Sequence, residues 1–393
     1  MTPHLSERFR TRLAERQSGA EPNAVEVVDA LLEAATHAGA SDVHLIPDES
    51  GLTMTWRLDG VLQTVDRIGK SISSNVVSRL KVLAGLLTYR SEVPQEGRIR
   101  SPGESEVEMR VSTFPTMYGE KAVVRLFVGS GQFRRLDDLG LPGDIQTWWR
   151  DLLLESGGVL LACGPAGSGK TTTTYASFRE LVDKSTTQRS LVSLEDPIEA
   201  VVPGVAQSQI NPAAGFTYEV GLKSLMRQDP EVILVGEIRD QLTAETVFQA
   251  ALTGHLVLST FHAGSAAGAI CRLSDMSIEP YLLRTGLLGI LAQRLVRCLC
   301  ECAEESLDER HRLGLPVDQV RVPQGCDACR GTGYRGRTLL AEFLRTESND
   351  LGRAILSRSD SDELEAMAVQ AGMRTRWDRA CDAVRDGLTS PAE

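Results

Sequence analysis

A glycine-rich segment that ends in a lysine is the strongest chemical signal in this sequence. It fits the spacing G-x-x-x-x-G-K-[ST] and directly follows an apolar run that begins at Val159. Glycines let successive backbone N–H groups surround phosphate oxygens, and the helix that follows points its positive end at the same anion. Lys170 is expected to reach the β- and γ-phosphates of a nucleotide, and the Thr171 hydroxyl to bind Mg²⁺. The predicted nucleotide-binding residues are Gly164, Pro165, Ala166, Gly167, Ser168, Gly169, Lys170, Thr171 and Thr172.

Two acidic clusters follow apolar runs further along the chain. Ser193-Leu-Glu195-Asp196-Pro197 is either a solvated loop or the source of a carboxylate, Glu195, that takes a proton from water attacking the γ-phosphate. In Val232-Ile-Leu-Val-Gly-Glu237, four apolar residues lead to an acid, a pattern typical of a carboxylate that holds Mg²⁺ through water. A buried acid without a cation is costly, so Glu237 is expected to have a partner.

Two histidines frame a third apolar run, Thr253-Gly-His255-Leu-Val-Leu-Ser-Thr-Phe-His262. A single histidine is usually structural. Two histidines at the ends of one strand favour a contact with the γ-phosphate, because that strand is expected beside the strand that precedes the glycine-rich loop (the P-loop).

The composition is that of an ordinary globular protein of two or three domains, with 393 residues, 42% hydrophobic and 24% charged. A net charge of −11 is the wrong sign for a protein that grips nucleic acid by its phosphates, so no direct nucleic-acid binding is expected. The N-terminus is charged, unlike a signal peptide, and the most apolar segment, residues 281–296, is too short to span a bilayer. These features predict a cytoplasmic protein whose eight cysteines are thiols or metal ligands.

The first part of the chain predicts a compact α+β domain over residues 24–128, after a polar N-terminal arm or short helix at residues 1–23. Asn23 is a plausible N-cap for the first helix of this domain, and Gly39 a plausible stop. Residues 129–138, which include Gly129-Ser-Gly131, are predicted to be a linker. Helices are expected at residues 24–38 and 71–87, and strands at 42–46, 52–58, 98–100, 107–113 and 121–128.

Residues 139–393 are predicted to form a second, α/β domain. Short continuous apolar strands alternate with helices, which indicates a parallel sheet covered on both faces. The P-loop lies at the carboxyl end of its strand, where such sheets bind ligands. From about Pro280 onward the pattern indicates helices, interrupted by a cysteine-bearing module at about residues 298–330.

Taken together, these motifs resemble the secretion and pilus-assembly ATPases of type II secretion systems and type IV pili, the GspE/PilB family. That family carries a P-loop, an "Asp box", a Walker B segment and a "His box", which appear here as GPAGSGKTT, SLEDPIE, RQDPEVILVGEIRD and TGHLVLSTFH. The first domain matches through Ser41-Asp-Val-His44 and Pro94-Gln-Glu-Gly-Arg98, among other segments. The resemblance covers about residues 24–345. It implies a RecA-like domain, preceded by a smaller PAS-like (N2-like) domain and followed by a helical region with a Cys module.

The resemblance also implies roles for single residues in the second domain. Glu195 matches the catalytic base and Glu237 the Walker B acid, while His255 and His262 would communicate with the γ-phosphate. ATP and Mg²⁺ are the implied ligands.

Family members form rings of six in which arginines of the first domain swing onto the nucleotide. Arg98 and Arg110 match those positions, with Arg125 as a weaker third, and Arg227 suits a subunit boundary. Guanidinium groups fit that task because they stay charged and present a planar fork to phosphate oxygens. The implied protein is a homo-hexameric motor at the inner face of the cytoplasmic membrane. It rotates about the 129–131 joint and drives an inner-membrane platform protein.

The cysteines of the module suggest a zinc site. Cys326-Asp-Ala-Cys329 is a C-x-x-C knuckle, and the second pair is Cys300 and Cys302, where the family usually has C-x-x-C. Thiolates about 2.3 Å from tetrahedral zinc can come from such a pair. Two alternatives stay open: Cys298 replaces Cys300, or the module has lost its metal.

The cysteine module favours secretion or assembly, because pilus retraction ATPases generally lack it. The resemblance also predicts a chain truncated at the N-terminus, without the domain that docks on the platform. The alternative functions are a nucleic-acid translocase or helicase with a related RecA-like core, and a retraction ATPase.

Overall fold

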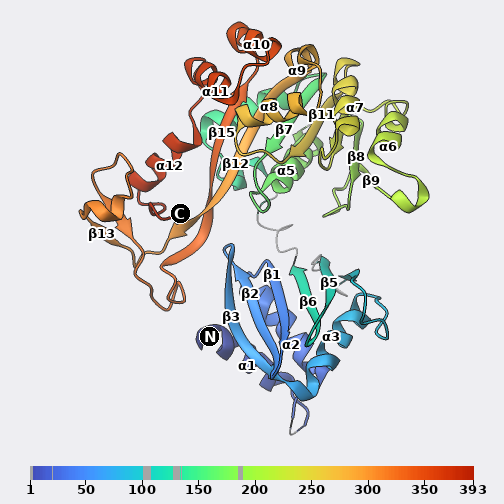
Figure 1. Cartoon of the computed structure of the whole chain (residues 1–393), viewed down its shortest axis with the longest axis vertical. Helices are drawn as coiled ribbons and strands as arrows, with labels where there is room; N and C mark the ends of the chain where they lie inside the picture. Colours follow the sequence, from blue (N-terminus) through green and yellow to red (C-terminus); the bar gives the residue numbers. More distant parts are fainter. Residues whose placement is uncertain (1–2, 20, 101–107, 127–132, 134, 185–188) are drawn as a thin grey trace. The chain divides into compact units, whose positions relative to one another are not determined.

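The computed structural model describes residues 3–19, 21–100, 108–126, 133, 135–184 and 189–393 (Figure 1). By internal contacts the chain divides into two compact units. The first contains residues 1–131, 300–303 and 323–336, and the second contains residues 132–299, 304–322 and 337–393. The predicted 129–131 joint lies outside the described residues. The domain limits expected from the sequence stay predictions, because compactness alone does not show that a segment folds independently.

The first unit is built on a six-stranded antiparallel sheet in the order β3-β2-β1-β6-β5-β4. Its helices contribute Leu31, Val77 and Leu80 to a core shared with Val43 and Leu45 of β1. The elements are α1 (Pro3–Arg16), α2 (Ala24–His37), β1 (Asp42–Asp48), β2 (Gly51–Leu58), β3 (Val61–Gly69), α3 (Lys70–Leu83), β4 (Gln95–Arg100), β5 (Glu108–Thr116) and β6 (Gly119–Leu126).

The N-terminal segment is helical and packed onto this unit. Leu5 and Phe9 of α1 are buried in its core. Arg10 of the same helix donates two hydrogen bonds to the nearly buried carboxylate of Asp66 in β3, at 2.7 and 3.1 Å. Asn23 caps α2 through the capping box expected from a side-chain acceptor at that position. Of the two forms expected for this segment, the structure shows a helix.

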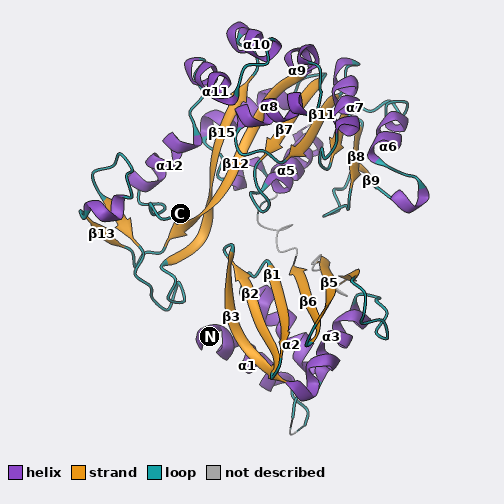
Figure 2. Cartoon of the chain, viewed as in Figure 1, coloured by secondary structure: helices purple, strands orange, loops and turns teal. Residues whose placement is uncertain are grey.

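The second unit contains a seven-stranded sheet in the order β15-β12-β7-β11-β10-β8-β9, and the neighbours from β12 to β9 run parallel. Figure 2 shows helices flanking this sheet. Successive residues of β7 (Gly158–Cys163) enter different cores, since Val159 and Leu161 belong to one cluster and Leu160 to another. The sheet is therefore covered on both faces, as its apolar strands predict.

The strands of this sheet and the short β13–β14 pair are β7 (Gly158–Cys163), β8 (Leu191–Glu195), β9 (Ala206–Gln209), β10 (Val232–Val235), β11 (Leu256–Phe261), β12 (Leu287–Leu299), β13 (Glu304–Ser306), β14 (Val320–Val322) and β15 (Tyr334–Arg345). The helices are α4 (Gly143–Leu153), α5 (Lys170–Lys184), α6 (Tyr218–Leu225), α7 (Gln241–Leu252), α8 (Ala266–Asp275), α9 (Pro280–Gly286), α10 (Asn349–Leu356), α11 (Ser361–Gln370) and α12 (Arg376–Arg385).

The prediction that the chain is helical from Pro280 onward, apart from the cysteine module, is wrong for β12 and β15. Both are long strands of the main sheet, and the next α-helix begins only at Asn349. An apolar run buried on both sides has no periodicity that separates strand from helix. Its place beside β7 decides the outcome, because Gly289 to Ala292 pair in register with Leu160 to Cys163. Within the described residues, no helix is both long and apolar enough to cross a bilayer.

Candidate active site

The P-loop connects the carboxyl end of β7 to the first residue of α5. Gly164 has a φ of 147°, and a Cβ there would lie 2.3 Å from the carbonyl oxygen of Gln293 and 2.6 Å from the Ser168 hydroxyl. Gly167 and Gly169 have φ values of 75° and 90°, which glycine adopts without steric cost. The loop therefore needs glycine at the first position for space and at the other two for backbone conformation.

Lys170 is folded back onto this loop. Its side chain donates to the carbonyl oxygens of Gly164 and Pro165 at 3.0 and 2.9 Å, and the residue is only 8% exposed. Burial lowers the pKa of Lys170. No carboxylate among the described residues forms an ion pair with it, and its hydrogen-bond acceptors in the loop are neutral carbonyl oxygens. A buried cation in that state is suited to receive an anion such as a phosphate.

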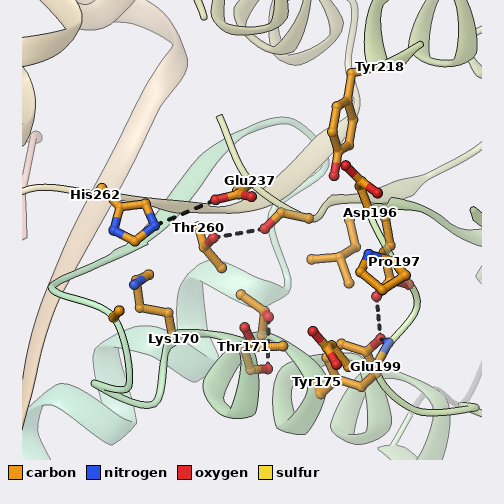
Figure 3. A pocket seen from close by; sticks show the side chains of 15 residues that line it. Lys170, Thr171, Tyr175, Asp196, Pro197, Glu199, Tyr218, Glu237, Thr260 and His262 are labelled. Carbon is orange, nitrogen blue, oxygen red and sulfur yellow. Dashed lines mark hydrogen bonds and ion pairs between the residues drawn. The ribbon is translucent and has the colours of Figure 1, made fainter. Parts of the chain in front are cut away.

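The parallel strands bring the predicted residues of separate motifs to one edge of the sheet. Lys170 and Thr171 begin α5, Glu195 ends β8, Glu237 follows β10 and His262 follows β11. They surround a cavity of about 220 Å³, shown in Figure 3. Its lining consists of Ala166, Lys170, Thr171, Thr174, Tyr175, Glu195, Asp196, Pro197, Glu199, Tyr218, Leu234, Gly236, Glu237, Thr260 and His262.

Glu237 has the cationic partner that a buried acid requires. The Arg239 Nε donates a hydrogen bond to the Glu237 carboxylate at 2.5 Å, and Nη2 of the same guanidinium group contacts the same carboxylate oxygen. The Arg239 Nη1 lies 3.5 Å from a carboxylate oxygen of Asp196. His262 Nε2 is 3.5 Å from the other oxygen of Glu237. Burial lowers the pKa of His262, which favours the neutral imidazole and leaves Arg239 as the main counter-charge. The Glu237 carboxylate and the Thr171 hydroxyl line the same cavity, and such oxygen donors suit Mg²⁺.

Glu195 is the most enclosed acid of the cavity, with 3% of its surface exposed. One carboxylate oxygen accepts from the Ser193 hydroxyl at 2.6 Å and from Gln207 Nε2 at 3.2 Å. The other accepts a hydrogen bond from the Tyr175 hydroxyl. Three donors thus hold this carboxylate in one orientation at the cavity wall, so the solvated-loop interpretation does not describe Glu195.

Sequence reasoning missed these three donors. Ser193 had a signal, because residues two apart on a strand share a face and Ser193 therefore lies beside Glu195. Tyr175 lies in α5 and Gln207 in β9, and no local spacing connects either of them with Glu195. The Tyr175 oxygen also accepts the backbone N–H of Glu199 at 3.0 Å, so it joins the P-loop helix to the acidic segment.

His255 is not brought into the cavity. It precedes β11, whereas His262 follows it, and the strand between them is six residues or about 20 Å long. The His255 ring instead contacts the carbonyl oxygen of Ala250 at 2.9 Å and the Thr253 hydroxyl at 3.1 Å, at the end of α7. The paired-histidine interpretation overlooked that the two ends of one strand lie at opposite edges of a sheet. We drop His255 from the candidate site.

In the first unit, the three arginines expected to reach the nucleotide lie in one row. Arg98 is opposite Arg110, Arg110 is opposite Arg125, and Arg125 is opposite Asp42 in neighbouring strands. Directly paired residues share a face of a sheet. Arg125 and Arg57 bind the Asp42 carboxylate, at 3.0 and 3.5 Å. Arg57 lies opposite Asp42 on the next strand, so the row together with Arg57 contains four arginines and one acid.

The four predicted cysteine ligands form a cluster in the first unit. The sulfur atoms of Cys300, Cys302, Cys326 and Cys329 all lie within 4.8 Å of one another, and none is in a disulfide. Three of the separations are 3.7 to 3.8 Å. Four thiolates around tetrahedral zinc at about 2.3 Å stand about 3.8 Å apart, so the donor set fits that metal. Cys298 is not part of the cluster.

The sequence matches the protein family described as "Type II/IV secretion system protein" over residues 17–393. It is 39% identical to "Type IV pilus assembly ATPase TfpB" of Acinetobacter baylyi over 381 residues, which cover 94% of this chain and 64% of that protein. It is also 39% identical to "Type II secretion system ATPase E" of Vibrio cholerae over 377 residues, covering 94% of this chain and 74% of the relative. The chain thus spans only part of these relatives.

Solved structures share the fold. The ATPase DotB of Legionella pneumophila superposes with a TM-score of 0.69 at 20% identity, covering 95% of both chains. The pilus retraction motor PilT with bound ADP gives a TM-score of 0.63 at 23% identity, covering 93% of this chain and 94% of that one. At these identities the likeness establishes an α/β fold with ATPases as structural neighbours.

Proposed function

The chain belongs to the family of type II/IV secretion system proteins, and we propose that it hydrolyses ATP in the cavity at the carboxyl ends of β7, β8, β10 and β11. One observation carries the proposal: a P-loop lysine, an enclosed carboxylate held by three donors and a second carboxylate after a neighbouring strand all line one cavity. The names of relatives such as "Type II secretion system ATPase E" support the same activity.

Each residue has a defined task in this proposal. The P-loop amides and Lys170 bind the phosphates, and Thr171 and Glu237 would hold Mg²⁺. Bound there, the ion supplies positive charge to the β- and γ-phosphate oxygens. Glu195 takes the proton of the attacking water, and its three donors keep it aimed. His262, beside Glu237, is the histidine placed to respond to the γ-phosphate.

We further propose that hydrolysis drives a motor for type II secretion or type IV pilus assembly. The names of relatives at 39% identity support this purpose, and so does the row of Arg98, Arg110 and Arg125, because guanidinium groups are suited to bind phosphate oxygens. The proposed assembly is a homo-hexamer at the cytoplasmic face of the membrane, acting on a platform protein. The small first domain is proposed to be PAS-like and the second RecA-like.

Lys170→Ala tests the nucleotide proposal directly. Without the ammonium, affinity for a fluorescent ATP analogue should fall at least tenfold, and Mg²⁺-dependent phosphate release should fall by about 10²-fold or more. An exposed lysine of α6, Lys223→Ala, is the control. Wild-type protein that releases no phosphate with Mg²⁺ and ATP, alone or with lipid vesicles, would contradict the proposed function.

The rival function of a nucleic-acid translocase makes a different prediction in the same assay. A net charge of −11 disfavours it, and so does family membership. Stimulation of phosphate release by single- or double-stranded DNA would restore it.

We propose that Cys300, Cys302, Cys326 and Cys329 bind one structural zinc ion. Native mass spectrometry and metal analysis should find one zinc per chain, and Cys326→Ser combined with Cys329→Ser should remove it. Because metal binding adds to folding free energy, the zinc-free variant should also have a lower Tm. Cys298→Ser is the matched control and should keep its zinc. Loss of zinc in that variant, or metal-free wild-type protein, would contradict the assignment.

A further inference from the structure

Tyr218 places a buried hydroxyl in the cavity, and this hydroxyl has no acceptor among the residues that the structure describes. It is the first residue of α6, and Figure 3 shows its ring directed from that helix toward Asp196. The hydroxyl oxygen is buried from solvent and forms no hydrogen bond to any described residue. Leaving a buried donor unpaired lowers stability, so a hydroxyl at this position points to a ligand that accepts a hydrogen bond from it.

The other hydroxyls of the cavity already donate hydrogen bonds or are assigned to Mg²⁺. Those of Thr174, Tyr175 and Thr260 donate to protein oxygens. Thr171, in the first turn of the P-loop helix, is assigned to Mg²⁺. Among the described hydroxyls on the acidic side of the cavity, Tyr218 is therefore the one that does not already donate a hydrogen bond.

The Tyr218 hydroxyl also lies near the acidic residues of the cavity. A Cβ added at Gly236 would be 3.0 Å from this hydroxyl and 3.3 Å from the Cα atom of Glu195, so the hydroxyl is close to the end of β8 and to the segment after β10. Burial, together with the charges of Asp196 and Glu237, raises the pKa of Tyr218, so the group stays protonated. The neighbouring carboxylates only accept hydrogen bonds, and Tyr218 supplies the complementary donor.

We propose that the Tyr218 hydroxyl orients the water that attacks the γ-phosphate, an inference that rests on the proposed ATP hydrolysis. In this step the water oxygen bonds to the γ-phosphorus and the bond from phosphorus to the β–γ bridging oxygen breaks. ADP leaves with that electron pair, and the proton of the water passes to Glu195. Tyr218 donates a hydrogen bond to the water oxygen and keeps its own proton throughout.

Tyr218→Phe tests the inference because it removes the hydroxyl and keeps the ring. At saturating ATP, kcat should fall about tenfold, the effect of one ordinary hydrogen bond. The Kd for the non-hydrolysable analogue AMP-PNP should not change, because the water is not part of the nucleotide. The Tm should stay the same or rise, since the hydroxyl makes no hydrogen bond to any residue that the structure describes. Tyr281→Phe, at an exposed position in α9, is the matched control and should equal wild type in all three measurements.

The outcomes separate this inference from the function on which it rests. Wild-type activity no greater than that of Lys170→Ala refutes the proposed hydrolysis, and this inference with it. An active wild type and an equally active Tyr218→Phe variant refute the inference alone. Weaker AMP-PNP binding in Tyr218→Phe also refutes it, because the hydroxyl would then contact the nucleotide rather than the water. A lower kcat together with a lower Tm would indicate a structural role and refute it as well.

Discussion

Replacing Glu195 with Gln is expected to lower kcat for ATP by about 10²- to 10⁴-fold, the usual contribution of a positioned general base. The amide keeps the size of the carboxylate and cannot take up the proton of the attacking water. Phosphate release at saturating ATP measures the loss, and equilibrium binding of AMP-PNP should remain near that of wild type. Glu219→Gln, at a partly exposed residue of α6 that pairs with Lys223, is the control.

The same variant should also lower the Tm, for a reason visible in the site. The Glu195 carboxylate accepts from Ser193, Gln207 and Tyr175, so an amide NH₂ must face at least one group that is itself a donor. Tyr175 is a poor alternative acceptor because its oxygen already accepts a backbone N–H. The expected cost is about 1–3 kcal/mol of unfolding free energy, measured by denaturant titration. Turnover equal to wild type would show that another group takes the proton.

Removing Arg98 and Arg110 together is the second substitution expected to have a large effect. If these guanidinium groups contact the phosphates during hydrolysis, the Arg98→Ala, Arg110→Ala variant should lose about 10³-fold in kcat, within the range for arginine fingers. The two residues lie directly opposite each other in β4 and β5, so either one alone could partly replace the other. The two single variants should therefore each lose little activity, and the fold-loss of the double variant should exceed the product of the two single fold-losses.

The control for this pair is Arg67→Ala, an arginine of the same sheet outside the row, which pairs with Asp48. Native mass spectrometry should accompany the assay, because the proposed hexamer must survive the substitution for the loss to be assigned to phosphate contact. A double variant that assembles like wild type and keeps its turnover would show that the row does not act on the nucleotide. In that case the proposed motion of the first domain during hydrolysis would need another cause.

Much of the second unit could be predicted from local sequence. Short apolar strands followed by glycine or acidic residues mark the carboxyl edge of a parallel sheet, so the sequence places Lys170, Glu195 and Glu237 each at that edge, and the observed strand pairing then brings them to one cavity. The same local reasoning failed for β12. A run that is buried on all sides carries no periodic pattern, and only its pairing with β7 decides that it is a strand.

The sequence by itself determined the parts of the site that depend on one short segment. Glycine spacing shapes the P-loop because backbone conformation is local, and cysteine spacing brings each thiol pair together for the same reason. Only the tertiary structure decided which residues meet across segments. It placed His262 in the cavity and His255 at the other edge of the sheet, held Glu195 with donors from α5 and β9, and directed Tyr218 into the cavity from α6. Those contacts depend on how strands and helices pack, which no short-range pattern encodes.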